Sequence, residues 1–289
     1  MTDEVLLLDG GLSTALEQQG FVVDGPLWTG ELLLRDPEAV TRAHRAFVDA
    51  GADILITGSY QLSYEGGRLA GLTDDDITRA LTNATVAARL ACDEATLVAA
   101  SVGPFGAHRN DGSEFRGYPD VSPATLREFH ARRLEVLLAS EPDLLAIETI
   151  PELAEAEVIL DLLDELDPAM PYWVSFTARR AGELSGGARF ADACALVAAH
   201  DAAIAVGINC SPLEVIAPTL RLAESELPFV VYPNAGQMWD SESMAWSGDA
   251  QFATSAAIAE WVALGARIIG GCCGYGPGHI ATCRTAILG

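Results

Sequence analysis

Short apolar runs alternate along the chain with longer segments in which apolar residues recur every three to four positions. Runs of the first kind predict buried β-strands, and segments of the second kind predict amphipathic helices. The predicted strands are residues 5–8, 53–57, 97–101, 143–149, 172–177, 203–210, 229–232 and 266–271. The predicted helices are residues 37–50, 73–93, a segment from about 122, 152–166, 190–200, a segment from about 211, and 277–288.

The order of these elements predicts a single (β/α)8 barrel, the TIM-barrel fold, as one domain over residues 1–289. Strands that alternate with helices form parallel sheets with right-handed crossovers, and eight such units favour closure into a barrel. The alternative is an open doubly wound sheet. That fold is disfavoured because no G-x-G-x-x-G turn follows the first predicted strand.

The charge of the chain excludes several classes of protein. It carries 41 acidic and 17 basic residues, a formal net charge of -24, and every basic residue is an arginine. A Schiff-base aldolase and a Walker-type phosphate loop both need a lysine, so neither is compatible with this sequence. An acidic chain without a basic stripe is also a poor partner for nucleic acid or anionic membranes.

The N-terminus is acidic and is followed only by a strand-length apolar run, which is not the pattern of a signal peptide. No apolar run reaches the roughly 18 residues of a membrane span. The predicted location is therefore the cytoplasm, where cysteines stay reduced. Cys92, Cys194 and Cys283 fall within helical patterns and are expected to be small buried side chains.

The other three cysteines follow predicted strands. Cys210 ends the sixth strand, and Cys272 and Cys273 follow the eighth. In a (β/α)8 barrel the carboxyl ends of all strands meet at the catalytic face, so these thiols are expected to lie together. Three thiolates without a fourth protein ligand fit an open, catalytic Zn²⁺ site. A zinc ion held by sulfur alone suits the binding of an incoming thiol as a nucleophilic thiolate.

The sequence also resembles the zinc-dependent homocysteine S-methyltransferase family, nearest to its branch that uses S-methylmethionine or S-adenosylmethionine. The resemblance covers almost the whole chain. It is carried by DGGLSTALEQQG (9–20), HRAFVDAGADILITGSYQ (44–61), ASVGPFGAHRNDGSEFRGY (100–118), ETIPELAEAE (148–157), WVSFTARRAGELSGG (173–187), GINCS (207–211), VYPNAG (231–236) and IIGGCCG (268–274). GINCS followed at this distance by GGCC is its most specific part.

The resemblance implies that Cys210, Cys272 and Cys273 ligate zinc and that the homocysteine sulfur takes the fourth position. It further implies that the amino-acid end of homocysteine is held by residues at the strand ends, namely Asp9, Gly10, Gly11 and Glu148, with Thr57 in the same pocket. Asn209 and Asn234 lie at the same strand ends and are further candidate substrate contacts, although Asn209 is equally compatible with a turn or with support of the neighbouring ligand.

The predicted reaction moves a methyl group from a sulfonium donor to homocysteine and gives methionine. A sulfonium pocket needs aromatic faces, and the aromatic candidates on the predicted loops are Trp28, Tyr60, Phe105, Tyr118, Trp239 and Trp246. One alternative is a methyltransferase for selenocysteine or selenohomocysteine, and another is a non-catalytic zinc or redox thiol sensor. The predicted partners are small molecules only, with the chain as a monomer or small homo-oligomer.

Overall fold

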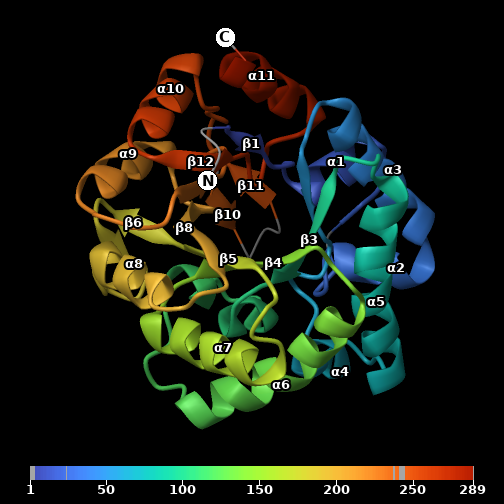
Figure 1. Ribbon diagram of the computed structural model, residues 1–289. Coiled ribbons are helices and arrows are strands. Elements are labelled where there is room, and N and C mark those ends of the chain that lie inside the picture. Colours follow the sequence, from blue (N-terminus) through green and yellow to red (C-terminus); the bar gives the residue numbers. More distant parts are fainter. Residues whose placement is uncertain (1–3, 24, 237, 241–244, 289) are drawn as a thin grey trace.

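Eight parallel strands form a nearly closed barrel surrounded by helices (Figure 1). The computed structural model describes residues 4–23, 25–236, 238–240 and 245–288. The barrel strands, in the order in which they neighbour one another, are β1 (Leu6–Leu7), β12 (Ala266–Ile269), β9 (Phe229–Tyr232), β8 (Ala203–Asn209), β5 (Tyr172–Phe176), β4 (Leu144–Ile150), β3 (Leu97–Val102) and β2 (Ile54–Ile56).

The barrel closes where β1 and β2, the two ends of this row of strands, come together. Leu8 forms a parallel bridge with Ile54, and the Asp53 N–H donates to the Leu7 carbonyl at 2.7 Å. The Asp9 N–H donates in turn to the Ile54 carbonyl at 3.1 Å. The predicted (β/α)8 barrel is thereby confirmed, and the open doubly wound sheet is wrong.

Seven helices occupy the predicted segments, and their starts follow from capping chemistry. They are α3 (Pro37–Asp49), α5 (Asp74–Ala91), α6 (Pro123–Ala139), α7 (Leu153–Leu166), α8 (Phe190–Ala198), α9 (Leu213–Arg221) and α11 (Pro277–Leu288). Thr73 and Asp76 form a reciprocal capping box at α5. The Asp36 and Ser122 side chains accept hydrogen bonds at the starts of α3 and α6, each of which has a proline in its first turn.

Other elements are absent from the prediction. They are the helices α1 (Leu12–Gln18), α2 (Thr29–Arg35), α4 (Tyr64–Leu69) and α10 (Ser255–Ala263), the 3₁₀ turns η1 (Phe105–Arg109) and η2 (Ser113–Phe115), and the hairpins β6–β7 (Ala178–Arg180, Glu183–Leu184) and β10–β11 (Met238–Asp240, Ala245–Ser247). Most of them have seven residues or fewer, whereas a helical pattern is read from a window of about eleven or more. The helix α10 has nine residues, as have the predicted α8 and α9, so its length does not explain why it was missed.

Alternation along the strands decides which side chains enter the barrel. On β4, Leu144 and Ala146 belong to the interior cluster, whereas Leu145 and Ile147 pack outward against the helices. The period of two therefore turns Glu148 inward. Small alanines from several strands leave room in the interior for Trp173 and Tyr232, whose rings lie at 83° to each other.

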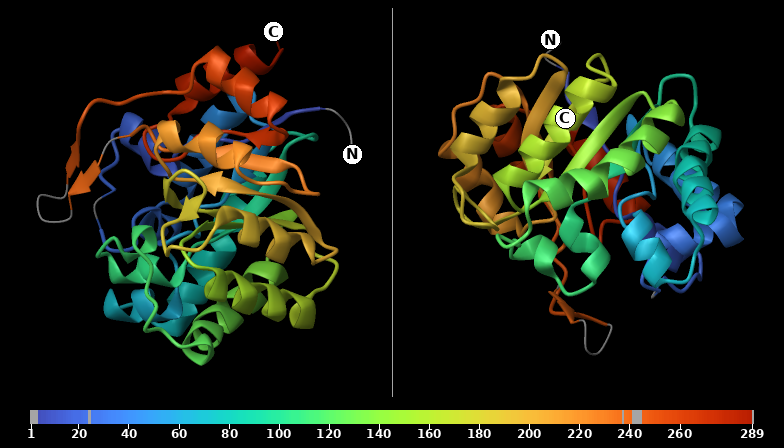
Figure 2. Two further views of the ribbon diagram at one scale, coloured as in Figure 1. Left: turned by 90° about the vertical axis from the view of Figure 1, so that its left-hand side faces the viewer. Right: turned by 90° about the horizontal axis from the view of Figure 1, so that it is seen from below.

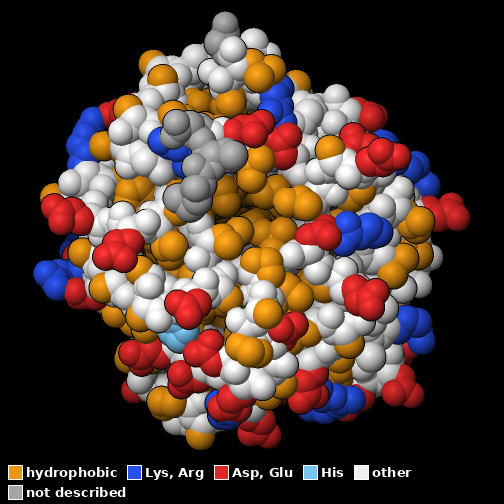
Figure 3. Space-filling view, in the orientation of Figure 1, with side chains coloured by type: hydrophobic (Ala, Val, Ile, Leu, Met, Phe, Trp, Pro, Cys, Tyr) orange, Lys and Arg blue, Asp and Glu red, His pale blue; other side chains and the backbone are white. Residues whose placement is uncertain are grey.

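The β10–β11 hairpin projects from the end of the barrel opposite the N-terminus (Figure 2). Because this hairpin follows β9, it marks the face where the strands end. Figure 3 views the opposite face, on which apolar side chains gather over the barrel centre and acidic groups are scattered around them. Within the described ranges, no helix is long and apolar enough to cross a membrane.

Gly207 on β8 packs directly against β9, and this contact leads to a prediction on stability. A Cβ atom at Gly207 would lie 1.7 Å from the Val230 carbonyl oxygen, so Gly207→Ala must displace one of the two strands. We expect the substitution to lower the free energy of unfolding by about 2 kcal/mol or more in urea denaturation. Gly278→Ala is the control, since a Cβ there meets nothing within 4 Å. Equal stability of the two variants would contradict this packing account.

Candidate metal and substrate site

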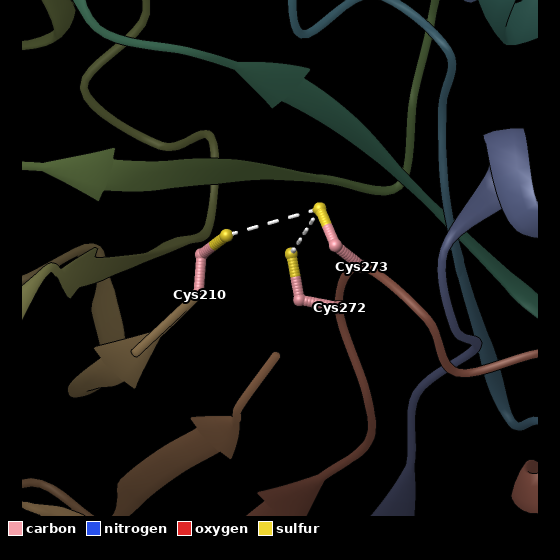
Figure 4. Close-up of side chains that lie close together, drawn as sticks. All are labelled: Cys210, Cys272 and Cys273. Atoms are coloured by element: carbon pink, nitrogen blue, oxygen red, sulfur yellow. Dashed lines mark hydrogen bonds between the residues drawn. The ribbon is translucent and has the colours of Figure 1, made fainter. Parts of the chain in front are cut away.

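The thiols of Cys210, Cys272 and Cys273 point toward one another at the mouth of the barrel (Figure 4). The Cys273 sulfur lies 4.0 Å from that of Cys210 and 3.9 Å from that of Cys272, and all three sulfurs lie within 4.8 Å of one another. A tetrahedral zinc ion with bonds of about 2.3 Å separates its sulfur ligands by about 3.8 Å. The donor set and spacing therefore fit zinc. The three cysteines are free in this structure, since the sulfurs of a disulfide lie about 2.05 Å apart.

Backbone contacts to the end of β9 hold the cysteines from both sides. The Cys210 N–H donates to the Tyr232 carbonyl at 3.0 Å, and the Cys272 N–H donates to the Pro233 carbonyl at 2.8 Å. Cys210 itself has a φ of 43°, in the left-handed region that a non-glycine residue rarely adopts. Such a conformation persists only where the surrounding structure enforces it, and it is frequent at functional sites.

Glycines allow the turn after β12 to pack tightly enough to present the two cysteines. A Cβ at Gly271 would lie 2.2 Å from the Tyr275 ring, and one at Gly10 would lie 2.1 Å from the Tyr275 carbonyl oxygen. A Cβ at Gly11 would approach the Cys272 carbonyl oxygen to 2.9 Å. The glycines at 10 and 11 therefore bring the β1–α1 turn into contact with the cysteine turn.

The three thiols share hydrogen bonds. Those from Cys210 and Cys272 to Cys273 hold the pKa of the Cys273 thiol well below its usual value, although burial opposes this shift. The thiolate is the form that binds a metal and acts as a nucleophile. The pKa values of the Cys210 and Cys272 thiols are raised well above their usual value, with burial among the causes, so one negative charge is favoured on the three sulfurs and it lies on Cys273.

A cavity of about 180 Å³ opens beside the thiols. It is lined by Gly10, Gly11, Leu12, Ser13, Trp28, Thr29, Ile56, Thr57, Gly58, Tyr60, Gln61, Glu114, Phe115, Glu148, Thr149, Cys210, Tyr232, Gly271, Cys272 and Cys273. The structure thus brings four of the predicted substrate residues together with the cysteines. Among the described residues, no lysine, arginine or histidine lines this cavity.

Glu148 presents a buried carboxyl group to the cavity. Its side chain is only 6 % exposed and is hydrogen-bonded by the Ser101 hydroxyl and by Tyr232. Burial raises the pKa of Glu148 to about 7, although both hydrogen bonds oppose the rise. Thr57 supports Ser101 by accepting a hydrogen bond from its backbone N–H at 3.0 Å.

Three of the predicted substrate residues do not line the cavity. Asp9 is 1 % exposed and accepts a hydrogen bond from the Ile56 N–H at 2.9 Å. Asn209 accepts from the Thr149 N–H and donates to the Thr149 hydroxyl, both at 2.8 Å. Asn234 donates to the Cys210 carbonyl at 3.2 Å. The two asparagines thus support the backbone at or beside the cysteines, and direct contact of all three residues with substrate stays a prediction.

The aromatic candidates also separate into groups. Trp28 and Tyr60 line the cavity, whereas Phe105 and Tyr118 pack against each other outside it. The side chains of Trp239 and Trp246 lie outside the described part of the structure.

The three cysteines outside the site differ in burial. Cys194 and Cys283 are buried as predicted, but Cys92, which follows α5, is half-buried.

Sequence reasoning missed several lining residues, among them Glu114, Phe115 and Tyr232. Glu114 and Phe115 lie in η2, within a loop rich in glycine and charge that has no periodicity. Tyr232 is the last residue of β9. The position of Tyr232 at a strand end could have indicated a place in the site. Because its neighbours in sequence are apolar, however, the residue has the pattern of a core residue.

Comparison with known proteins decides the family. The profile of the family described as "Homocysteine S-methyltransferase" matches residues 6–287. The chain belongs to this family. Homocysteine S-methyltransferase YbgG of Bacillus subtilis (strain 168) is 37 % identical over 294 residues, covering 96 % of this chain and 93 % of that protein. Homocysteine S-methyltransferase of Escherichia coli (strain K12) is 38 % identical over 295 residues, covering 97 % and 94 %.

A solved structure from the family agrees with the architecture. The metallated form of the homocysteine methyltransferase MmuM from Escherichia coli superposes with a TM-score of 0.87 at 36 % identity. The match covers 98 % of this chain and 96 % of that one. The family assignment therefore extends over the whole barrel, including the ends of the strands that carry the cysteines.

The pKa of Glu148 leads to a prediction on stability. Its pKa rises from an ordinary value of 4.5 to about 7 on folding, so between these values the folded protein holds a proton that the unfolded chain has lost. Glu148 therefore destabilises the fold progressively as pH rises through this window. We expect Glu148→Gln to gain stability relative to the parent protein between pH 5 and pH 8, by on the order of 2 kcal/mol.

Urea unfolding of both proteins at the two pH values measures this difference. The comparison between variants removes the contribution of all other titrating groups that the two proteins share. A stability difference that does not change with pH would show that the Glu148 carboxyl is ionised in the fold throughout.

Proposed function

We propose that this chain is a zinc-dependent homocysteine S-methyltransferase that uses S-methylmethionine or S-adenosylmethionine as donor. The homocysteine sulfur would attack the donor methyl carbon, a new carbon–sulfur bond would form, and the carbon–sulfur bond of the donor would break. The thiol proton is released to solvent, and the donor leaves as a neutral thioether. Residues 1–289 would act as one catalytic domain, because all eight strands contribute to the barrel interior.

The observation that carries this proposal is the convergence of three thiols and a buried carboxyl group on one cavity. Cys210, Cys272 and Cys273 would hold the zinc ion. When bound, Zn²⁺ supplies a Lewis acid that keeps the homocysteine sulfur deprotonated while leaving it nucleophilic. A site of three protein sulfurs leaves one coordination position for that substrate.

The remaining residues would bind and orient the amino-acid end of homocysteine. The Glu148 carboxylate is suited to pair with the substrate ammonium group, and pairing would also favour its ionised form. The substrate carboxylate would lie against the turn at Gly10 and Gly11. The Gly11 N–H already donates to the Tyr275 carbonyl at 2.9 Å, so Gly10 is the better candidate donor.

The apolar part of the cavity would favour the reaction itself. A thiolate and a sulfonium lose their opposite charges as the methyl group moves, so a site that excludes water assists the step. Leu12, Ile56 and Phe115 contribute apolar surface to this lining. The Tyr232 ring, with Trp173 behind it, closes the barrel interior beneath.

Replacement of one cysteine tests the metal site. The purified protein is expected to hold about one zinc ion per chain, and Cys210→Ala is expected to lose most of the zinc and at least about a hundredfold in methyl transfer to homocysteine. Cys92→Ala is the matched control, since Cys92 directly follows α5 and does not line the cavity. Metal analysis and methionine formation measure the two effects. Full activity of a zinc-free Cys210→Ala protein would refute the mechanism.

Replacement of Glu148 tests the binding of homocysteine separately from the metal. Glu148→Ala is expected to raise the KM for homocysteine about tenfold or more, because a charged hydrogen bond to the ammonium group is lost. The zinc content should remain that of the parent protein. If zinc were lost in step with activity, Glu148 would instead be a support of the metal site.

A further inference from the structure

Glu114 is a second carboxyl group in the cavity, and neither the metal site nor the proposed homocysteine contacts use it. It is the middle residue of η2, in the loop between β3 and α6, and it lines the cavity. Its Oε2 atom is buried and has no hydrogen-bond partner among the described residues. A desolvated carboxylate oxygen without a partner is costly, so this position needs either a proton or a cation.

The loop that carries Glu114 is held in place from several sides. The Glu155 carboxylate, itself fully buried, accepts hydrogen bonds from the Phe105 N–H at 2.6 Å and from the Tyr118 hydroxyl. The Tyr118 N–H donates to Glu152 at 2.5 Å. The Thr177 hydroxyl donates to the backbone carbonyl of Glu114 itself at 3.2 Å. The carboxyl group is thus presented by a backbone that is fixed on both sides of η2.

No basic side chain of the described residues lines the cavity beside Glu114, although the charge of Arg116, outside the lining, lowers the pKa of Glu114 in part. The nearest arginine in sequence, Arg116, donates to the backbone carbonyl of Asp111 at 2.7 Å and is not part of the lining. Burial raises the pKa of Glu114 to about 7. The charges of Glu114, Cys210 and Glu148 all act on the buried Tyr60 hydroxyl and add to the rise of its pKa that burial causes. The carboxyl group therefore lies within electrostatic reach of the reacting centre.

Aromatic and carboxylate groups occur together on this part of the wall. Phe115 follows Glu114 in the same turn, and Tyr60 and Trp28 line the same cavity. Aromatic faces attract cations that carry apolar substituents, and a carboxylate adds the opposite charge. We propose that Glu114 supplies the counter-charge for a cationic methyl donor and thereby selects donors with a net positive charge.

This assignment rests on the proposed function and deepens it by naming a residue that selects the donor. S-methylmethionine and S-adenosylmethionine each carry a sulfonium and an ammonium group against one carboxylate, so both have a net charge of about +1 in their amino-acid part at neutral pH. Homocysteine, with one ammonium and one carboxylate group, needs only Glu148. The second carboxyl group of the cavity matches the additional positive charge of the donor.

Glu114→Gln removes the charge and keeps the size of the side chain. With zinc-loaded protein and S-methylmethionine, the KM for the donor is expected to rise at least about tenfold, while kcat does not fall. The KM is expected to rise without a fall in kcat because the counter-charge stabilises the bound donor more than it stabilises the transition state, in which the sulfonium charge is disappearing. The KM for homocysteine and the zinc content are expected to stay within about twofold.

Glu94→Gln is the matched control, because Glu94 is exposed in the turn before β3, at the far end of the barrel. It should leave both KM values unchanged. Calorimetric titration of S-methylmethionine into the zinc-loaded proteins provides a readout that does not depend on turnover. Glu114→Gln should weaken this binding by the same factor as it raises the KM for the donor.

Inhibition by methionine, measured against the donor at saturating homocysteine, identifies which positive group Glu114 contacts. Methionine keeps the ammonium group but has a neutral sulfur. Unchanged inhibition in Glu114→Gln would assign the contact to the sulfonium, and an equal loss would assign it to the ammonium group. Both results support a counter-charge for the donor.

Two results would overturn the assignment. One is a KM and a calorimetric affinity for the donor that do not change in Glu114→Gln, and the other is a rise confined to the KM for homocysteine. A parent protein that binds S-methylmethionine through Glu114 but transfers no methyl group would leave this assignment standing. It would instead contradict the proposed function.

Discussion

The end of β9 is the constraint on which the site depends. In the barrel β9 lies between β8 and β12. The carbonyl of its last residue, Tyr232, accepts from the Cys210 N–H, and that of the next residue, Pro233, accepts from the Cys272 N–H. The separation of the sulfurs is therefore set by the spacing of three parallel strands. A residue in the left-handed conformation at Cys210 and glycines before Cys272 complete the geometry. The fold itself supplies most of the preorganisation that a three-sulfur site needs.

The second property of the site is a cluster of buried acidic groups that have no basic partners in the lining. Three thiols and two carboxyl groups line one small cavity, and the described lining contains no basic side chain to balance them. Burial is the largest cause that raises the pKa values of Glu114 and Glu148 to about 7, and neighbouring negative groups add to it. Such an arrangement is unfavourable unless cations enter it. A metal ion, an ammonium group and a sulfonium would each pair with one or more of these acidic groups. The binding of the metal and of both substrates would therefore follow from the same cluster of acidic groups.

Much of this account could be predicted from the sequence, because the signals concerned are periodic. Eight apolar runs predicted the strands, and the parallel barrel then brought Cys210 to Cys272 and Cys273 across 62 positions of sequence. Short helices such as α1 and α4 gave no signal of comparable length. The position of Glu114 depends on hydrogen bonds that its loop donates to the carboxylates of Glu155 and Glu152, and on one that it accepts from the Thr177 hydroxyl. Contacts between distant segments of this kind leave no local pattern.

Zinc X-ray absorption spectroscopy of the protein, before and after addition of homocysteine, tests the central claim most directly. The account predicts three sulfur neighbours at about 2.3 Å and one lighter ligand in the protein alone. Homocysteine should replace the lighter ligand, so that four sulfurs surround the metal. A spectrum that does not change when homocysteine is bound would contradict the account, because the substrate thiol would then react away from the metal.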